Sequence, residues 1–207
     1  MKSSCLFLML TLTCQAATLV TDVQNVNTPV PDNDPVGLSS TMTLVTTLTS
    51  IQYLRVTLDF SNGWSGDIYC YIIHDSGFSV LLNRIGRSSL VPEGASNNRL
   101  SLNLFDAAPT DVHTGVPTSG SVTGDYQPDG RKISQSASLD TSPRTAPLSA
   151  FNGMDANGEW TLFVADVASG ETMTLNSWSM TLTGVPEPAA ALLGTLGLFL
   201  ALRRRRA

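Results

Sequence analysis

Between residues 28 and 184, apolar and polar side chains alternate along short runs that are separated by Gly, Pro, Asn, Asp and Ser. A period of two is typical of a strand with one buried face, whereas an amphipathic helix repeats every 3.6 residues. Many short strands with turn signals between them predict an all-β fold, and we expect an antiparallel, jelly-roll-like β-sandwich. The expected strands are 41–49, 55–60, 67–74, 78–82, 100–106, 159–166 and 174–183.

The apolar positions of these runs predict the core. Ile68, Cys70 and Ile72 share one face of their run, so Cys70 is expected to point inward as a small hydrophobic residue. Trp160 and Trp178 are expected to fill the interior with large rings. The other predicted core residues are Met42, Leu44, Leu48, Val56, Leu58, Phe60, Leu100, Leu102, Leu104, Leu162, Val164, Met180 and Leu182.

Two long stretches, 106–120 and 125–147, are rich in Pro, Ser, Thr, Gly and Asp and show little periodicity. Such composition is typical of loops. Their length makes them candidates for binding specificity. The alternative is that they are solvated spacers.

The first 16 residues have the pattern of a secretory signal peptide. Lys2 supplies a positive start, residues 5–13 form a short apolar run, and Ala16 offers a small residue for cleavage. The run is too short to span a bilayer stably. We expect cleavage after Ala16; the alternative is a buried N-terminal strand.

The last 23 residues, 185–207, have three parts: Pro186-Glu187-Pro188, an apolar stretch over 189–202, and a basic end. As a helix, the 14 apolar residues reach roughly 21 Å, against a hydrocarbon core of roughly 30 Å. The basic residues are expected to stay in the cytoplasm, which places the rest of the chain outside. They are Arg203, Arg204, Arg205 and Arg206.

In this order and position, the three parts resemble the PEP-CTERM sorting signal of Gram-negative bacteria. The resemblance implies that an exosortase, a membrane cysteine transpeptidase, removes the tail near Pro186 to Pro188. The protein would be anchored transiently in the inner membrane and then reach the cell surface or the medium, with exopolysaccharide or a surface protein as a partner. The alternative is a permanent single-pass anchor.

The body of the chain, residues 17–184, is acidic. It carries 16 Asp and Glu residues against 7 Lys and Arg residues, a net charge of −9. Such a balance argues against nucleic acid and anionic lipid as partners. Cys70 is the single cysteine of this span, so the body forms no internal disulfide.

Several segments of the body occur in an order that is known from another family. They are 30–33, 51–60, 66–72, 100–107 (LSLNLFDA), 124–128 (GDYQP), 147–166, which contains Asn-Gly-Glu-Trp, and Leu175 to Met180. In this order they resemble the P-domain, or P/Homo B domain, over about residues 28–184. The resemblance implies the β-sandwich accessory domain that follows the catalytic domain of kexin- and furin-like convertases. The segments 62–65, 74–75 and 131–146 depart from the family pattern.

The sequence does not predict an enzyme. A Ser-His-Asp triad needs a histidine base beside an exposed nucleophile and an oxyanion hole. The two histidines are His74, at the end of an expected strand, and His113, in an expected loop. Neither lies near a Gly-x-Ser-x-Gly elbow.

Calcium is the candidate metal. Asp67, Asp106 and Asp166 stand at strand ends, where carboxylate oxygens can gather around Ca²⁺. Some P-domains hold calcium, so the resemblance favours this reading. The alternative is that these acids cap turns and keep the surface soluble. No zinc-ligand spacing is present.

These observations predict an exported, non-catalytic surface or extracellular-matrix protein that an exosortase sorts through its tail. Two alternatives stay open. One is a module that binds glycan or protein, for which Tyr53, Trp64, Tyr69, Tyr71 and Tyr126 offer aromatic faces. The other is an accessory P-domain for a separately encoded subtilisin-like protease.

Overall fold

The computed structural model describes residues 17–21 and 23–186. The expected signal peptide with its cleavage site at Ala16 lies outside these residues, as do Glu187, Pro188 and the arginine cluster of the tail. Their assignment stays a prediction.

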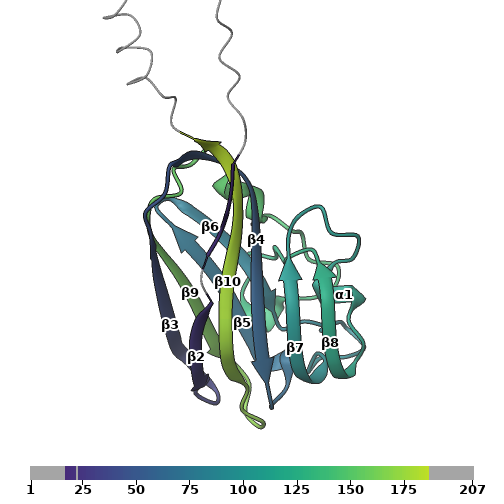
Figure 1. Cartoon of the computed structure of the whole chain (residues 1–207). Coiled ribbons are helices and arrows are strands. Elements are labelled where there is room, and N and C mark those ends of the chain that lie inside the picture. Colours follow the sequence, from purple (N-terminus) through teal and green to yellow (C-terminus); the bar gives the residue numbers. More distant parts are fainter. Residues whose placement is uncertain (1–16, 22, 187–207) are drawn as a thin grey trace, which may run out of the picture.

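Two β-sheets pack face to face, and the described chain is mostly strand (Figure 1). The larger sheet has six strands in the order β1-β10-β4-β7-β8, with β2 also paired to β10. They are β1 (Ala17–Val20), β2 (Gln24–Pro29), β4 (Leu48–Ser61), β7 (Ser96–Leu104), β8 (Ser119–Tyr126) and β10 (Thr174–Pro186).

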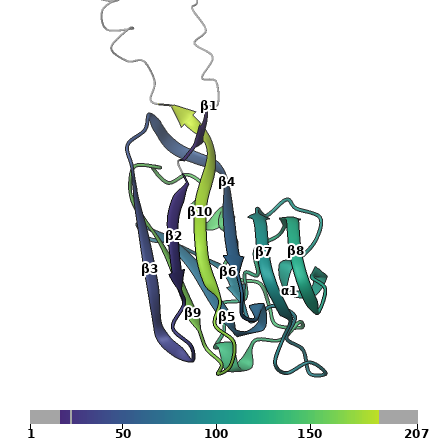
Figure 2. The same cartoon turned by 60° about the horizontal axis from the view of Figure 1, so that its bottom comes forward.

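The smaller sheet has four strands in the order β3-β9-β5-β6 (Figure 2). All pairings in the two sheets are antiparallel within the described residues, except that β7 and β8 run parallel. The all-β sandwich expected from the sequence is confirmed. The strands of the smaller sheet are β3 (Asp34–Leu44), β5 (Ile68–His74), β6 (Gly77–Asn83) and β9 (Gly158–Asp166).

The core lies between the sheets and contains the residues that the alternation predicts. Ile68, Cys70 and Ile72 are fully buried, so Cys70 points inward as expected. Trp160 and Trp178 are the largest buried side chains. Each indole N–H finds an acceptor: Trp160 donates to the carbonyl of Ala156 at 3.1 Å, and Trp178 to the hydroxyl of Ser40 at 2.9 Å. Every other predicted core residue is also buried.

The first predicted strand, 41–49, is divided in the structure. β3 ends at Leu44 and β4 begins at Leu48, with a turn between them. Val45 is 94% exposed in this turn, and the backbone N–H of Thr46 donates to the side chain of Asn157. The sequence pattern continues through the turn because Leu44 and Leu48 both face the core, one from each sheet.

The two long loops are not solvated spacers throughout. The first contains the one-turn helix α1 (Val112–Gly115), and residues 119–126, at the end of the first loop and the start of the second, form β8. In the second, Asp129 is fully buried and accepts hydrogen bonds from the backbone N–H groups of Asn83 and Arg131. The Arg131 guanidinium pairs with Asp111 at 2.9 Å and so ties the second loop to the first.

The first and last described strands are neighbours. β1 pairs with β10 in a register that places Ala17 opposite Gly184, so both ends of the domain lie at the same end of the sandwich (Figure 1). Across residues 17–21 and 23–186, no helix is long and apolar enough to cross a membrane.

A bulge in β3 gives a test of the fold. Gly37 has φ +56°, and a Cβ there would lie 2.3 Å from the carbonyl oxygen of Val164. Gly120 also has a positive φ, but a Cβ there would meet nothing within 4 Å. We expect Gly120→Ala to cost about 1–2 kcal/mol of backbone strain. Gly37→Ala should cost about 1–3 kcal/mol more, because β9 must also move.

Urea unfolding of both variants measures the difference. Equal destabilisation by Gly37→Ala and Gly120→Ala would show that β3 and β9 do not approach each other as closely as described.

Candidate interaction surface

The outer face of the smaller sheet carries a group of large apolar side chains. Because Ile68, Cys70 and Ile72 face the core, the alternate residues of β5 point outward. Neighbouring strands add one ring each, from β6 and β9, and all four rings are half-buried. We call this group the aromatic surface: Tyr69, Tyr71, Ile73, Phe78 and Phe163.

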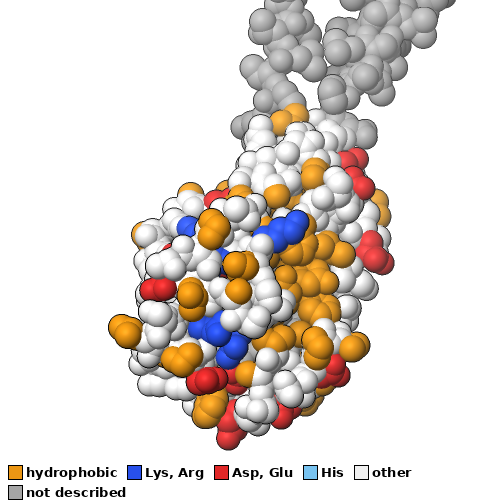
Figure 3. Space-filling view, turned by 180° about the vertical axis from the view of Figure 1, so that it is seen from behind, with side chains coloured by type: hydrophobic (Ala, Val, Ile, Leu, Met, Phe, Trp, Pro, Cys, Tyr) orange, Lys and Arg blue, Asp and Glu red, His pale blue; other side chains and the backbone are white. Residues whose placement is uncertain are grey.

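Tyr71 is the centre of the aromatic surface. Its ring stacks on Phe163 with the centroids 4.7 Å apart and the planes at 19°, and it lies 5.1 Å from Phe78 and 5.7 Å from Tyr69. The sheet fixes these contacts, since Tyr71 is opposite Phe163 and Ile73 is opposite Phe78. Seen from behind, the hydrophobic side chains form a continuous area on this face (Figure 3). The rings of this surface therefore pack against one another.

The tyrosine hydroxyls of this surface stay neutral. Burial, followed by the nearby Tyr71, raises the pKa of Tyr69 to about 12. Burial also raises the pKa of Tyr71. Both phenols therefore keep their protons at physiological pH, and each can donate a hydrogen bond to a partner.

A single lysine borders the surface. The ammonium nitrogen of Lys132 lies 4.8 Å from the ring centroid of Phe78, within the range of a cation–π contact. Lys132 is the only lysine between residues 17 and 186, and its side chain is exposed. In an acidic domain, this places a positive charge at the edge of the aromatic surface.

The opposite face of the sandwich is different. Along the outward positions of β10 in the larger sheet stand Ser177, Ser179, Thr181 and Thr183, all half-buried. An apolar exception is the pair Tyr53 and Phe105, with centroids 6.1 Å apart.

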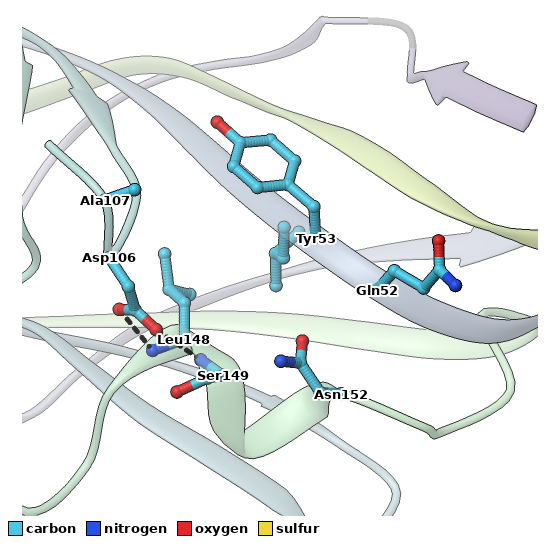
Figure 4. Close-up of a pocket in the computed structure, with 8 residues that line it drawn as sticks. Gln52, Tyr53, Asp106, Ala107, Leu148, Ser149 and Asn152 are labelled. Atoms are coloured by element: carbon cyan, nitrogen blue, oxygen red, sulfur yellow. Dashed lines mark hydrogen bonds between the residues drawn. The ribbon is translucent and has the colours of Figure 1, made fainter. Parts of the chain in front are cut away.

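A small pocket lies beside Tyr53, between β4 and the short 3-10 helix η3 (Leu148–Phe151), with a volume of about 130 Å³ (Figure 4). The carboxylate of Asp106 faces the start of η3 and accepts the backbone N–H groups of Leu148 at 3.0 Å and Ser149 at 2.7 Å. Asp106 thus caps a helical turn, which is the alternative that the sequence left open for it.

Asp67 and Asp166 meet at one end of the smaller sheet, because β5 begins where the antiparallel β9 ends and Ile68 is opposite Asp166. Asp67 is 3% exposed and Asp166 is fully buried. One oxygen of each carboxylate, Oδ2, has no hydrogen-bond partner. Arg84 approaches Asp67, with Nη2 4.0 Å from Oδ1.

Burial raises the pKa of both carboxyl groups. Desolvation, followed by the charge of Asp166, raises the pKa of Asp67 to about 6. Desolvation likewise raises the pKa of Asp166 to about 6, although the backbone N–H of Ala168 lowers it in part. Both groups therefore lie in an environment that disfavours their ionised form.

The structure brings together two of the three expected calcium ligands, Asp67 and Asp166. Asp106 lies elsewhere, next to the end of β7 in the larger sheet. No three acidic, histidine or cysteine side chains converge into a metal-binding group in the described part of the chain. Asp106 lies apart from the other two because it follows β7 of the larger sheet, and sequence position does not reveal in which sheet a strand ends.

Both histidines are buried in structural roles. His74 stacks on Trp160 with the centroids 4.1 Å apart, and its ring nitrogens face the carbonyls of Glu159 and Asp155. His113 pairs with Asp129 at 2.6 Å through Nδ1, while Nε2 faces a backbone carbonyl. In the described residues neither ring contacts a hydroxyl or thiol, so the His–Asp pair has no nucleophile to activate.

The sequence identified Tyr69 and Tyr71 as aromatic faces but missed Phe78 and Phe163. Both phenylalanines occupy outward positions of their strands, which the alternation shows. That they join the tyrosines depends on the order β9-β5-β6, which no local pattern specifies.

The family model of the proprotein convertase P-domain matches the chain over residues 124–182. The match includes β9 and most of β8 and β10. The model describes a domain that accompanies the convertase protease, in agreement with the expectation that this chain is not an enzyme. No curated protein matches the sequence.

Two solved structures are similar in part. One is the Aeromonas sobria serine protease in complex with a chaperone, with 17% identity over 83% of this chain and a TM-score of 0.47. The other is the serine protease of Aeromonas sobria, with 16% identity over 82% of this chain and a TM-score of 0.45. This chain spans about a quarter of their length, 27% in each case.

The buried acids predict a pH dependence. Their pKa of about 6 in the fold exceeds the ordinary aspartate value of 3.8, so the folded chain binds these protons more tightly than the unfolded chain. The stability that these two protonated carboxyl groups contribute to the folded state is complete below pH 3.8 and is lost as the pH rises through about 6. At pH 8, Asp166→Asn should be more stable than wild type by on the order of 2 kcal/mol.

Urea unfolding at several pH values measures this effect, with Asp140→Asn, at an exposed carboxylate, as the control. If the free energy of unfolding of wild type and of Asp166→Asn varied with pH in the same way, the raised pKa of Asp166 would be contradicted.

The same variant tests the calcium expectation. Ligation of Ca²⁺ by Asp67 and Asp166 would let added Ca²⁺ raise the melting temperature of the wild type, and EGTA reverse it. Asp166→Asn should then respond less. If added Ca²⁺ leaves the melting temperature of the wild type unchanged, Asp67 and Asp166 are not calcium ligands.

Proposed function

We propose that this chain is a non-catalytic accessory domain of the P-domain type, and that it binds a subtilisin-like protease carried on a separate chain. The observation that carries the proposal is the match of residues 124–182 to the proprotein convertase P-domain. The resemblance of segments 30–33, 51–60 and 66–72 extends the likeness toward the N-terminal half of the sandwich.

The arrangement of the site supports an accessory role. The residues that the structure describes form one sandwich with one core. One of its histidines is used for packing, and the other makes a buried hydrogen bond to Asp129. The loops that connect the strands are held by internal hydrogen bonds, such as that from Arg131 to Asp111. A rigid domain of this kind can support a partner by binding it without ordering a loop first.

Binding to a protease tests the proposal. The probes are the exported subtilisin-like proteases of the same host, each with its nucleophilic serine replaced by alanine and mixed with the full chain. We expect a one-to-one complex in size-exclusion chromatography with light scattering, and a higher melting temperature of the protease in the complex. Failure of every such protease to form a complex or gain stability would overturn the accessory role.

We also propose that the protein is exported and sorted to the cell surface or matrix, where exopolysaccharide or a surface protein is its neighbour. The supporting pattern is the signal-like sequence of residues 1–16 together with the tail Pro186-Glu187-Pro188, 189–202 and the arginine cluster. Every strand that the structure describes, from β1 at Ala17 onward, lies on the C-terminal side of this expected cleavage site.

Deletion of the host's exosortase tests the sorting. In the wild-type host the intact mass of the mature protein should lack residues 1–16 and end near Pro186 to Pro188. In the deletion strain the tail should remain attached and the protein should stay in the inner-membrane fraction. The same mass and location in both strains would reject exosortase processing.

A further inference from the structure

We propose that His74 is a pH-sensitive switch. Its ring closes the turn formed by residues 152–157 onto the end of β5 only when both ring nitrogens carry a proton, and loss of one proton releases this turn. His74 is the last residue of β5 and is 4% exposed. The switch is a property of the domain alone and does not require a bound protease.

The hydrogen-bond partners of His74 set the number of protons on its ring. Nδ1 lies 2.9 Å from the carbonyl oxygen of Glu159, and Nε2 lies 2.8 Å from the carbonyl oxygen of Asp155. A backbone carbonyl only accepts hydrogen bonds, so each contact needs an N–H on the ring. A neutral imidazole has one N–H and would place the lone pair of its other nitrogen against a carbonyl oxygen. Only the positively charged ring, with two N–H groups, satisfies both partners.

His113 has a different set of partners. Its Nε2 faces the carbonyl oxygen of Arg87 at 2.8 Å, but its Nδ1 faces the carboxyl group of Asp129 at 2.6 Å. There the second proton can belong either to the ring or to the carboxyl group. Neither carbonyl beside His74 can hold a proton, so at His74 the second proton belongs to the ring.

The surroundings of His74 favour a positive charge. The ring stacks on Trp160 with the centroids 4.1 Å apart and the planes at 4°, and the face of an indole attracts a cation. The charged side chains next to it are three exposed carboxylates, Asp75 after β5, Asp155 in the turn and Glu159 on β9. The sequences of the adjacent β6 and η3 contain no charged residue. Nearby opposite charges favour the protonated form of a base.

The two contacts differ in how firmly their acceptors are held. Glu159 lies in β9 and is opposite Thr43 of β3, so the sheet fixes its carbonyl. Asp155 lies in the turn, where the backbone follows no strand. When the ring loses one proton, we therefore expect the contact to Asp155 to open and the contact to Glu159 to remain.

The 152–157 turn also joins the two sheets. The backbone N–H of Ile51 donates to the carbonyl of Met154 at 2.8 Å, and the backbone N–H of Gly153 donates to the carbonyl of Ile51 at 2.7 Å. Ile51 belongs to β4 and is opposite Gly184 of β10. Release of the turn from His74 should therefore loosen the end of the sandwich at which β10 ends.

Nitrogen-15 NMR of the histidine-labelled full chain tests the proton count. The chain has two histidines, and contact of the ring protons with Trp160 identifies His74. The spectra are recorded from about pH 5.5 to about pH 8.5, a range that brackets the ordinary titration of histidine. Both nitrogens of His74 should be protonated at the acidic end, and one should lose its proton at the basic end. A single neutral tautomer across the whole range would overturn the switch.

Hydrogen exchange tests the release of the turn. In the wild type, the protection of the Ile51 and Gly153 amides, corrected for the intrinsic effect of pH, should fall roughly tenfold across the same range, since a buried acceptor loses its donor. The amide of Leu102, in the central strand β7, reports any change in global stability and is the internal reference.

His74→Phe is the matched variant, because it keeps a ring against Trp160 but has no donor. Relative to Leu102, its Ile51 and Gly153 amides should be weakly protected at both ends of the pH range. Protection of these two amides that changes equally with pH in wild type and His74→Phe, or that changes in neither, would contradict the switch. Should His74→Phe not fold, the NMR titration and the exchange of the wild type relative to Leu102 decide the question.

Discussion

The two-residue period of β5 and β9 is the constraint on which the rest of the molecule depends. On the inner side it delivers Ile72 and Trp160 to the core, where both are fully buried. On the outer side the same backbone delivers Tyr71 and Phe163, paired across the two strands. A shift of one residue in this register would exchange the two sets, exposing the core and burying the hydroxyls. The register that secures the fold therefore also creates the aromatic surface.

Buried polar groups hold the irregular part of the chain. The pair of His113 and Asp129 is fully buried, and Arg131 reaches both Asp129 and Asp111. Removing one member of such a network leaves a buried charge without its partner, which is more costly than losing a surface ion pair. These contacts give two long, Pro- and Ser-rich loops a defined position against β6, and they also place Lys132 beside Phe78.

Much of the fold could be predicted because the core depends on local alternation. The buried positions of β4, β5, β7, β9 and β10 follow directly from the period of two. The strands that escaped prediction are polar or short: β2 reads QNVNTP, and β8 has one buried residue, Val122. Such strands form because a neighbouring strand supplies hydrogen bonds, and their own sequence contains no pattern that predicts which strand this is.

The candidate site was harder to predict because it depends on which strands become neighbours. Asp67 and Asp166 were expected to gather with Asp106, but only strands β5 and β9 bring their ends together. Tyr71 was recognised as an aromatic face, whereas its contact with Phe163 requires a pairing across about ninety residues of sequence. Composition identified the residue types, and topology decided which of them meet.

The pairing of Ala17 with Gly184 has a mechanical consequence. A force that pulls the two ends of the domain apart acts on β1 and β10 at their shared end, so it separates their hydrogen bonds one after another, as a zipper opens. A force applied to the C-terminal end of β10 while the outer face of the smaller sheet is held acts differently. It must break the pairing of β10 with β4 and its packing on the core at the same time. The domain therefore resists tension well when it is held by one end and one face, and poorly when it is held by both ends.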